Sequence, residues 1–137
     1  MPYDILALAN EFALDSAPVS CASWGEGHIN DTYRVTCASG AHYILQRINP
    51  NVFPNPMHVM ENVVAVTRFL RAQVRDAREC LTLLPTRAGN YAVQDEAGGC
   101  WRVYAFIDGT ICLQTPETPE DFYESAVAFG RFARLLA

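Results

Sequence analysis

The sequence lacks several patterns that would each assign a protein to a broad class. It has no apolar run near the ~20 residues that a membrane-spanning helix needs. It also has no basic stripe, since ten Lys and Arg stand against fifteen Asp and Glu, for a formal net charge of −5. Binding to a nucleic-acid backbone normally requires clustered positive charge. We therefore expect neither a membrane nor a nucleic acid as a partner.

The cysteines also lack a metal-binding or disulfide pattern. Their number is odd, and no two of them have the CxxC spacing that is common in zinc clusters. Because thiols stay reduced in the cytoplasm, we expect a cytoplasmic protein. The five positions are Cys21, Cys37, Cys80, Cys100 and Cys112.

The N-terminus has no basic start of the kind found in signal peptides. Asp4, Asn10 and Glu11 interrupt the apolar residues of the segment 1–14. Polar residues spaced in this way are typical of an amphipathic helix, whereas the core of a signal peptide is uninterrupted. We predict a helix here.

The patterns that are present predict one compact α+β domain. The chain has 137 residues, half of them hydrophobic, which is enough for one core. We expect an antiparallel sheet of five to six strands with one central packed helix, an N-terminal helix and a C-terminal helix. Thr118 and Pro119, followed by two acids, indicate the start of the last helix. The predicted strands are 18–24, 32–38, 42–48, 80–85, 91–94 and 100–107, and the later helices are 57–74 and 119–136.

The segment Trp24 to Val35 carries the most specific pattern. It places Gly25 and Gly27 in a polar run between two predicted strands. Glycines at such a turn let the backbone N–H groups approach a row of phosphates. Taken alone, the same residues also fit an ordinary hairpin, because Gly, Asn and Asp are common in hairpin turns.

Residues further along the chain identify a resemblance. Gly27, Asn30, Tyr33 and Val35 match the G-x-x-N-x-x-Y-x-V pattern of the aminoglycoside phosphotransferase and choline kinase superfamily. The run GHINDTYRV, followed by YILQRINPNVFPNPMHVMENV, resembles the N-acetylhexosamine 1-kinase group, some of whose members carry a "mucin desulfatase" label. The resemblance implies a protein-kinase-like small lobe at 1–107 that binds nucleotide. Residues 108–137 would then be the inter-lobe linker and the first helix of a second lobe.

The resemblance also implies roles for particular residues. The loop would cover the phosphates of ATP, a cation on the third strand would contact them, and an acid on the following helix would orient that cation. Arg47 holds the third-strand position. Glu61 is either its partner or a solvated acid near a helix start. The loop residues are Gly25, Gly27, His28, Asn30 and Thr32.

The linker is expected to bind adenine through its backbone. Tyr104, Ala105 and Ile107 align with this linker, where backbone groups of Ala105 and Ile107 would exchange hydrogen bonds with the base. Apolar walls would complete the adenine site, although ordinary core packing needs the same residue types. The expected wall residues are Val19, Cys21, Val35, Ile44 and Tyr104.

Several parts that the family uses for catalysis are not in this sequence. None of its three histidines begins the H-x-D-x-x-x-x-N catalytic loop. We therefore assign no catalytic and no metal-binding residue to this chain, and expect the Mg²⁺ ligands and the sugar site in a missing second lobe. The chain would be an inactive piece of a sugar 1-kinase. The alternative is a stand-alone, non-catalytic interaction or regulatory module.

The last predicted helix carries more apolar residues than one face can bury. In the absence of a second lobe, we expect these residues to drive self-association into a homo-oligomer. A helix that folds back over its own sheet is the competing outcome. The apolar positions are Phe122, Val127, Phe129, Phe132, Leu135 and Leu136.

Overall fold

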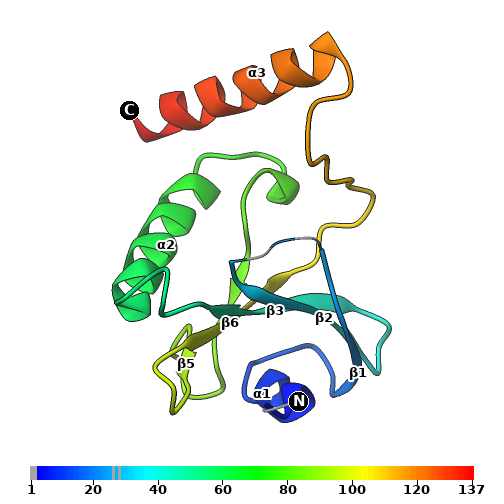
Figure 1. The fold of residues 1–137 in the computed structure, drawn as a ribbon, viewed down its shortest axis with the longest axis vertical. Coiled ribbons are helices and arrows are strands. Elements are labelled where there is room, and N and C mark those ends of the chain that lie inside the picture. Colours follow the sequence, from blue (N-terminus) through cyan, green and yellow to red (C-terminus); the bar gives the residue numbers. More distant parts are fainter. Residues whose placement is uncertain (1–2, 26, 28) are drawn as a thin grey trace.

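The computed structural model describes residues 3–25, 27 and 29–137 of the chain. Within them the fold is α+β, as predicted, with a six-stranded antiparallel sheet and helices on both of its faces (Figure 1). The helices are α1 (Ile5–Asn10), α2 (Pro56–Arg71) and α3 (Pro119–Leu136), with a 3-10 turn, η1 (Ala77–Glu79). The strands are β1 (Pro18–Ser23), β2 (Asp31–Cys37), β3 (His42–Ile48), β4 (Leu83–Leu84), β5 (Val93–Gln94) and β6 (Cys100–Ala105).

β3 and β6 lie at the centre of the sheet. The strand order is β1-β2-β3-β6-β4, and β5 pairs with β6 as well. The register places Gln46 of β3 opposite both Thr32 of β2 and Arg102 of β6. Directly opposite residues of an antiparallel pair present their side chains to the same face. These three side chains therefore form one row across the sheet.

The second group of strands is shorter than predicted. β4 covers two residues, because the Arg71 guanidinium takes the carbonyls of Cys80 and Leu81, at 3.2 and 2.7 Å, before the strand can begin. β6 ends at Ala105, where the chain leaves the sheet for an irregular linker that reaches α3. The first three strands and the central helix lie within a few residues of their predicted bounds.

The two faces of the sheet are covered by different helices. Figure 1 shows α1 on one side and α2 on the other. The α1 side holds the larger core, formed by Ile5, Ala9, Phe12, Val35, Leu45, Trp101 and Val103. The α2 side holds a small buried cluster of Ile48, Met60 and Cys100. The α2 side therefore has room for half-buried polar side chains between the strands and the helix.

Side-chain caps fix where α1 and α3 begin. Asp4 Oδ1 accepts from the backbone N–H of Ala7 at 3.1 Å. At α3, Thr118 Oγ1 accepts from the Asp121 N–H at 3.3 Å, and Asp121 Oδ2 accepts from the Thr118 N–H at 3.0 Å. This reciprocal capping box confirms the predicted start of the last helix.

The outermost helix, α3, has no buried residue. It contacts the rest of the chain through an ion pair between Arg131 and Glu79, 2.8 Å apart and largely exposed. A hollow lined partly by Leu70 of α2 and Phe132 of α3 lies between the two helices. Phe129 is 73% exposed. In the part of the chain that the structure describes, no helix is both long and apolar enough to cross a bilayer.

Candidate functional site

The glycine-rich loop between β1 and β2 is fastened to the end of β3. Gly25 has a φ of +79°, a left-handed conformation that residues with a side chain rarely adopt. The Asn30 side chain accepts from the backbone N–H of Asn49 at 2.9 Å, and the Asn49 side chain donates to the carbonyl of Ile29 at 3.0 Å. Asn30 and Asn49 therefore tie the loop to the residue that follows β3.

The two glycines of this loop have open space around them. A Cβ added at Gly25 or at Gly27 would meet no heavy atom within 4 Å. Internal crowding thus does not explain a glycine at either place. The left-handed φ of Gly25 already accounts for the glycine there, and the open space at both positions leaves room for another molecule to approach the backbone. His28, the remaining predicted residue in the middle of the loop, lies outside the described residues.

A row of polar side chains crosses the α2 side of the sheet, next to the strand that leaves the loop. Gln46 Nε2 donates to Thr32 Oγ1 at 3.0 Å. On the other side of Gln46, Arg102 donates to Gln46 Oε1 through Nε at 3.1 Å and through Nη2 at 2.7 Å. Arg102 Nη1 also lies 3.9 Å from the sulfur of Met60 on α2. The row therefore holds a positive charge in a fixed position.

A second cation lies on the same side of the sheet. The Arg34 guanidinium carbon is 4.3 Å from the ring centroid of Trp24 and 5.7 Å from that of Phe106. The two rings meet edge to face, with centroids 5.5 Å apart. Arg34 is opposite Ile44 in the register, and Ile44 points to the same face of the sheet as Gln46, two residues further along β3. This cluster connects the start of the loop with the first residue after β6.

Arg47 lies in β3, as expected, but its side chain pairs with an acid other than Glu61. Its Nε donates to Asp95 Oδ2 at 2.7 Å, and the side chains of the pair are only 12% and 8% exposed. The Arg47 guanidinium carbon also lies 5.3 Å from the ring centroid of Tyr3, next to α1. Arg47 therefore faces the α1 side of the sheet, where it pairs with Asp95, and the first of the two alternatives for Glu61, a pair with Arg47, is not formed.

The physical reason is the alternation of side chains along β3. Gln46 and Arg47 are neighbours, so they point to opposite faces, and Gln46 is the one that faces α2. Glu61 is an exposed residue of α2 and lines a hollow with Arg68 and Tyr91. This exposure agrees with the second alternative for Glu61, a solvated acid near the start of a helix.

The two buried or half-buried arginines have different electrostatic surroundings. Burial alone would raise the pKa of Asp95, but hydrogen bonds from Arg47, Gly99 and Trp101, and the charge of Arg47, bring it below its ordinary value. Burial lowers the pKa of Arg102, and Tyr104 offsets part of that effect. Arginine remains protonated at neutral pH. Arg47 is thus neutralised by a partner, while Arg102 is a desolvated cation with neutral partners.

The linker residues keep only part of the expected hydrogen-bonding capacity. The Ala105 N–H donates to the carbonyl of Thr82 at 2.9 Å, so it is already used within the sheet. The carbonyl of Ile107 accepts from Thr110 Oγ1 at 3.1 Å and has a second lone pair. Burial raises the pKa of Tyr104, whose side chain shares the α2 side with Ile44.

The predicted apolar walls do not come together around one site. Cys21 and Val35 pack in the core beneath α1. Ile44 and Tyr104 are opposite each other on the α2 side. Val19 is exposed where the pairing of β1 with β2 is irregular. Of the five predicted residues, the register therefore places two, Ile44 and Tyr104, on the α2 side.

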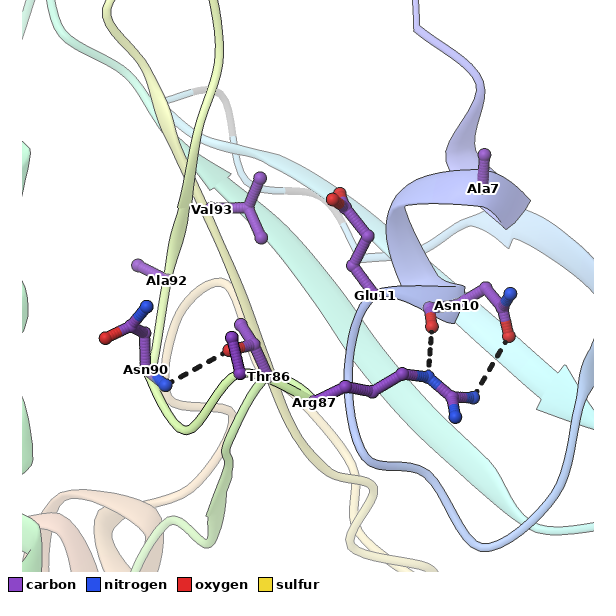
Figure 2. A pocket seen from close by; sticks show the side chains of 9 residues that line it. Ala7, Asn10, Glu11, Thr86, Arg87, Asn90, Ala92 and Val93 are labelled. Carbon is purple, nitrogen blue, oxygen red and sulfur yellow. Dashed lines mark hydrogen bonds between the residues drawn. The ribbon is translucent and has the colours of Figure 1, made fainter.

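A hollow on the α1 side of the sheet has polar residues that the fold already uses. Figure 2 shows Arg87 donating to the carbonyl of Asn10 at 2.7 Å and to its side chain at 3.3 Å, and the Asn90 N–H donating to Thr86 Oγ1 at 3.1 Å. The Arg87 N–H also donates to the carbonyl of Glu11 at 2.9 Å. These bonds tie the end of α1 to the turn after β4, so we read the hollow (≈ 720 Å³) as structural.

No model of a known protein family matches the chain. Among the described residues, no three His, Cys, Asp or Glu side chains are grouped so that they could hold a metal ion. The site is therefore defined by its geometry: an open glycine loop, the row Thr32–Gln46–Arg102, and the Arg34 cluster, all on or beside the α2 side of the sheet.

Sequence reasoning missed Arg102 and Arg34. A signal for both was present, because Thr32 and Arg34 are two residues apart in one predicted strand, as are Arg102 and Tyr104 in another. Two-residue spacing places side chains on one face. What the sequence did not reveal was which face of each strand lies beneath α2.

Proposed function

We propose that residues 1–107 form the nucleotide-binding lobe of an ATP-dependent phosphotransferase of the aminoglycoside phosphotransferase and choline kinase superfamily. The observation that carries the proposal is the arrangement of the α2 side of the sheet. An open, glycine-rich loop leads into a strand whose side chains join a fixed cation, and the chain leaves the sheet two strands away at the linker. Loop, cation and linker are the parts with which such lobes hold a nucleotide.

The acceptor in this proposal is a small hydroxylated metabolite, and the resemblance favours the anomeric hydroxyl of an N-acetylated hexosamine. The groups that bind Mg²⁺ and activate the nucleophile belong to a second lobe. Phosphoryl transfer depends on those groups for charge stabilisation and positioning. We therefore expect the 137-residue chain to bind ATP and to transfer its phosphate at a negligible rate.

The test is a titration of the ¹⁵N-labelled chain with Mg-ATP, followed by two-dimensional NMR. We expect chemical-shift changes at the amides of Gly25, Gly27 and Ile107. Amides of the turn at Gly89, on the edge of the sheet away from the loop, should not move. The absence of shifts at millimolar ATP, or shifts of equal size at Gly89, would contradict the proposal.

A pair of glycine variants sharpens this test. Gly25 and Gly89 both have positive φ, +79° and +92°, and both have open space where a Cβ would lie. Gly25→Ala and Gly89→Ala therefore introduce the same kind of backbone strain in two turns. ATP affinity should fall in Gly25→Ala alone. An equal fall in both variants would mean that strain, and not the loop, governs binding.

The alternative, a non-catalytic interaction module, is favoured by one observation. α3 has no buried residue, and aromatic side chains such as Phe122 and Phe129 are mostly exposed on it. Exposed apolar surface of this extent is typical of contact sites between proteins. The alternative predicts no ATP-induced shifts, so the same titration separates the two functions.

A further inference from the structure

The α2 side of the sheet carries positive charge without an acidic partner. Arg102 and Arg34 both belong to it, whereas none of the residues that β2, β3 and β6 present to this side carries a carboxylate. Asp31 is opposite Arg47, on the other face.

Arg102 is the member of this surface that is held most firmly. Two of its nitrogens bind one oxygen of Gln46, at 3.1 and 2.7 Å. Gln46 is oriented in turn by its bond to Thr32, the second residue of β2 and five residues after Gly27. Both ion pairs within the described residues involve other arginines, so no described carboxylate lies within 4.0 Å of Arg102. A half-buried guanidinium with neutral partners retains strong affinity for an oxyanion.

We propose that Arg102, held by Gln46, is the cation that binds the phosphate chain of the nucleotide, in the role that sequence reasoning gave to Arg47. The inference rests on the proposed function, because it assigns a residue to the phosphate part of the same site. Arg102 touches the ligand, and Gln46 acts as a positioning residue by fixing the guanidinium. The group that Arg102 would bind is a phosphoryl oxyanion, which either a nucleotide or free inorganic polyphosphate could supply.

The charge of Arg102 can be removed and compared with a matched control. Arg102→Gln removes the proposed cation, and Arg134→Gln removes one exposed arginine from α3, so the net charge is the same in both. Dissociation constants are measured by NMR titration with metal-free ATP, adenosine and inorganic tripolyphosphate. Losing one charge-assisted contact should weaken ATP and tripolyphosphate binding about 10-fold or more in Arg102→Gln alone. Adenosine binding should not change.

A second variant tests the site without removing the arginine. Gln46→Glu places a carboxylate at the position whose oxygen lies 2.7 Å from Arg102 Nη2. The new ion pair should neutralise the site, so tripolyphosphate binding should be lost while thermal stability is kept or rises. A Gln46→Glu protein that is stable and binds tripolyphosphate as tightly as the parent chain would overturn the inference.

The ligands distinguish failure of the inference from failure of the function. If ATP shifts Ile107 and the loop glycines but Arg102→Gln binds ATP as tightly as Arg134→Gln, the inference is overturned and the nucleotide function stands. If tripolyphosphate binding depends on Arg102 while neither ATP nor adenosine shifts Ile107, the anion site stands and the nucleotide function fails. If the parent chain binds no tripolyphosphate at millimolar concentration, the inference is overturned.

Discussion

The buried carboxylate Asp95 offers the sharpest test of what holds the sheet together. Asp95 accepts from Arg47 Nε at 2.7 Å, from the Trp101 indole N–H at 3.0 Å, and from the backbone N–H groups of Gly99 at 2.9 Å and Ala97 at 3.0 Å. Asp95→Asn removes the charge and replaces one acceptor oxygen with an NH₂ donor. That donor must face either Arg47 or one of the N–H groups, all of which are donors themselves.

The cost follows from the burial of the groups that lose their partner. Trp101 is fully buried and Arg47 is 12% exposed, so water cannot easily replace the carboxylate. Breaking a buried ion pair by removing one partner costs about 3–5 kcal/mol. For a chain of this length we expect Tm to fall by about 10–20 °C. The bonds form one network, so their separate energies must not be added.

The assay is urea unfolding followed by tryptophan fluorescence, with Glu96→Gln as the matched control. Glu96 lies in the same turn, carries the same charge and is exposed, so its neutralisation should leave stability nearly unchanged. The indole N–H resonance of Trp101 should also shift in Asp95→Asn alone. The reasoning is refuted if Asp95→Asn loses no more stability than Glu96→Gln at an unchanged m-value.

The lowered pKa of Asp95 fixes the sign of a pH effect on the same variant. Unfolded Asp takes up a proton near pH 3.9, whereas folded Asp95 does so at lower pH, so the stabilisation is present above about pH 4 and is lost as pH falls further. The free energy of unfolding of the parent chain should therefore approach that of Asp95→Asn in acid. A difference between the two proteins that stays constant down to pH 2 would contradict this sign.

Three further predictions test other parts of the structure. Gly99→Ala should destabilise the chain, because the new Cβ would lie 2.5 Å from Arg47 guanidinium atoms and displace them from Asp95. A Tm equal to that of the parent chain in a thermal scan would contradict this. Thr118→Ala should lower the helicity of α3, measured by circular dichroism, and lower stability by about 1 kcal/mol, since it removes the cap of that helix. The self-association expected from the exposed face of α3 stays a prediction. Phe129→Glu should shift the mass measured by light scattering toward that of the monomer, whereas Glu120→Gln should not. Equal masses for the two variants would count against self-association through this face.

The order of elements could be predicted because each one carries a local signal. The Thr118 cap, the two-residue alternation of β2 and β3, and the glycine turn at Gly25 all depend on residues close together in sequence. The short length of β4 could not be predicted, because the side chain of Arg71, at the end of α2, takes the carbonyls of Cys80 and Leu81 that a longer strand would use. Competition of this kind depends on tertiary contacts.

For a related reason, the loop of the candidate site could be predicted from the sequence, whereas the cation beside it could not. A motif fixes which residues lie in β3, but Gln46 and Arg47 exchange roles if the face beneath α2 is assigned differently. The turn 95–99 decides the question, because it brings Asp95 to the α1 side, where it neutralises Arg47. That acid is forty-eight residues away in the chain, and no local pattern links it to β3.

The two arginines differ in a way that follows from their partners alone. Arg47 forms a closed pair with Asp95, shielded from solvent, so dissolved salt should screen their attraction only weakly. Arg102 is half-buried, and its partners Gln46 and Met60 are neutral. Glu61, the acid of α2, is exposed and forms no ion pair with a described residue of the sheet, so the position of this helix does not depend on such a pair. The charge of Arg102 therefore stays available, and attraction between it and an incoming anion should weaken as salt is added.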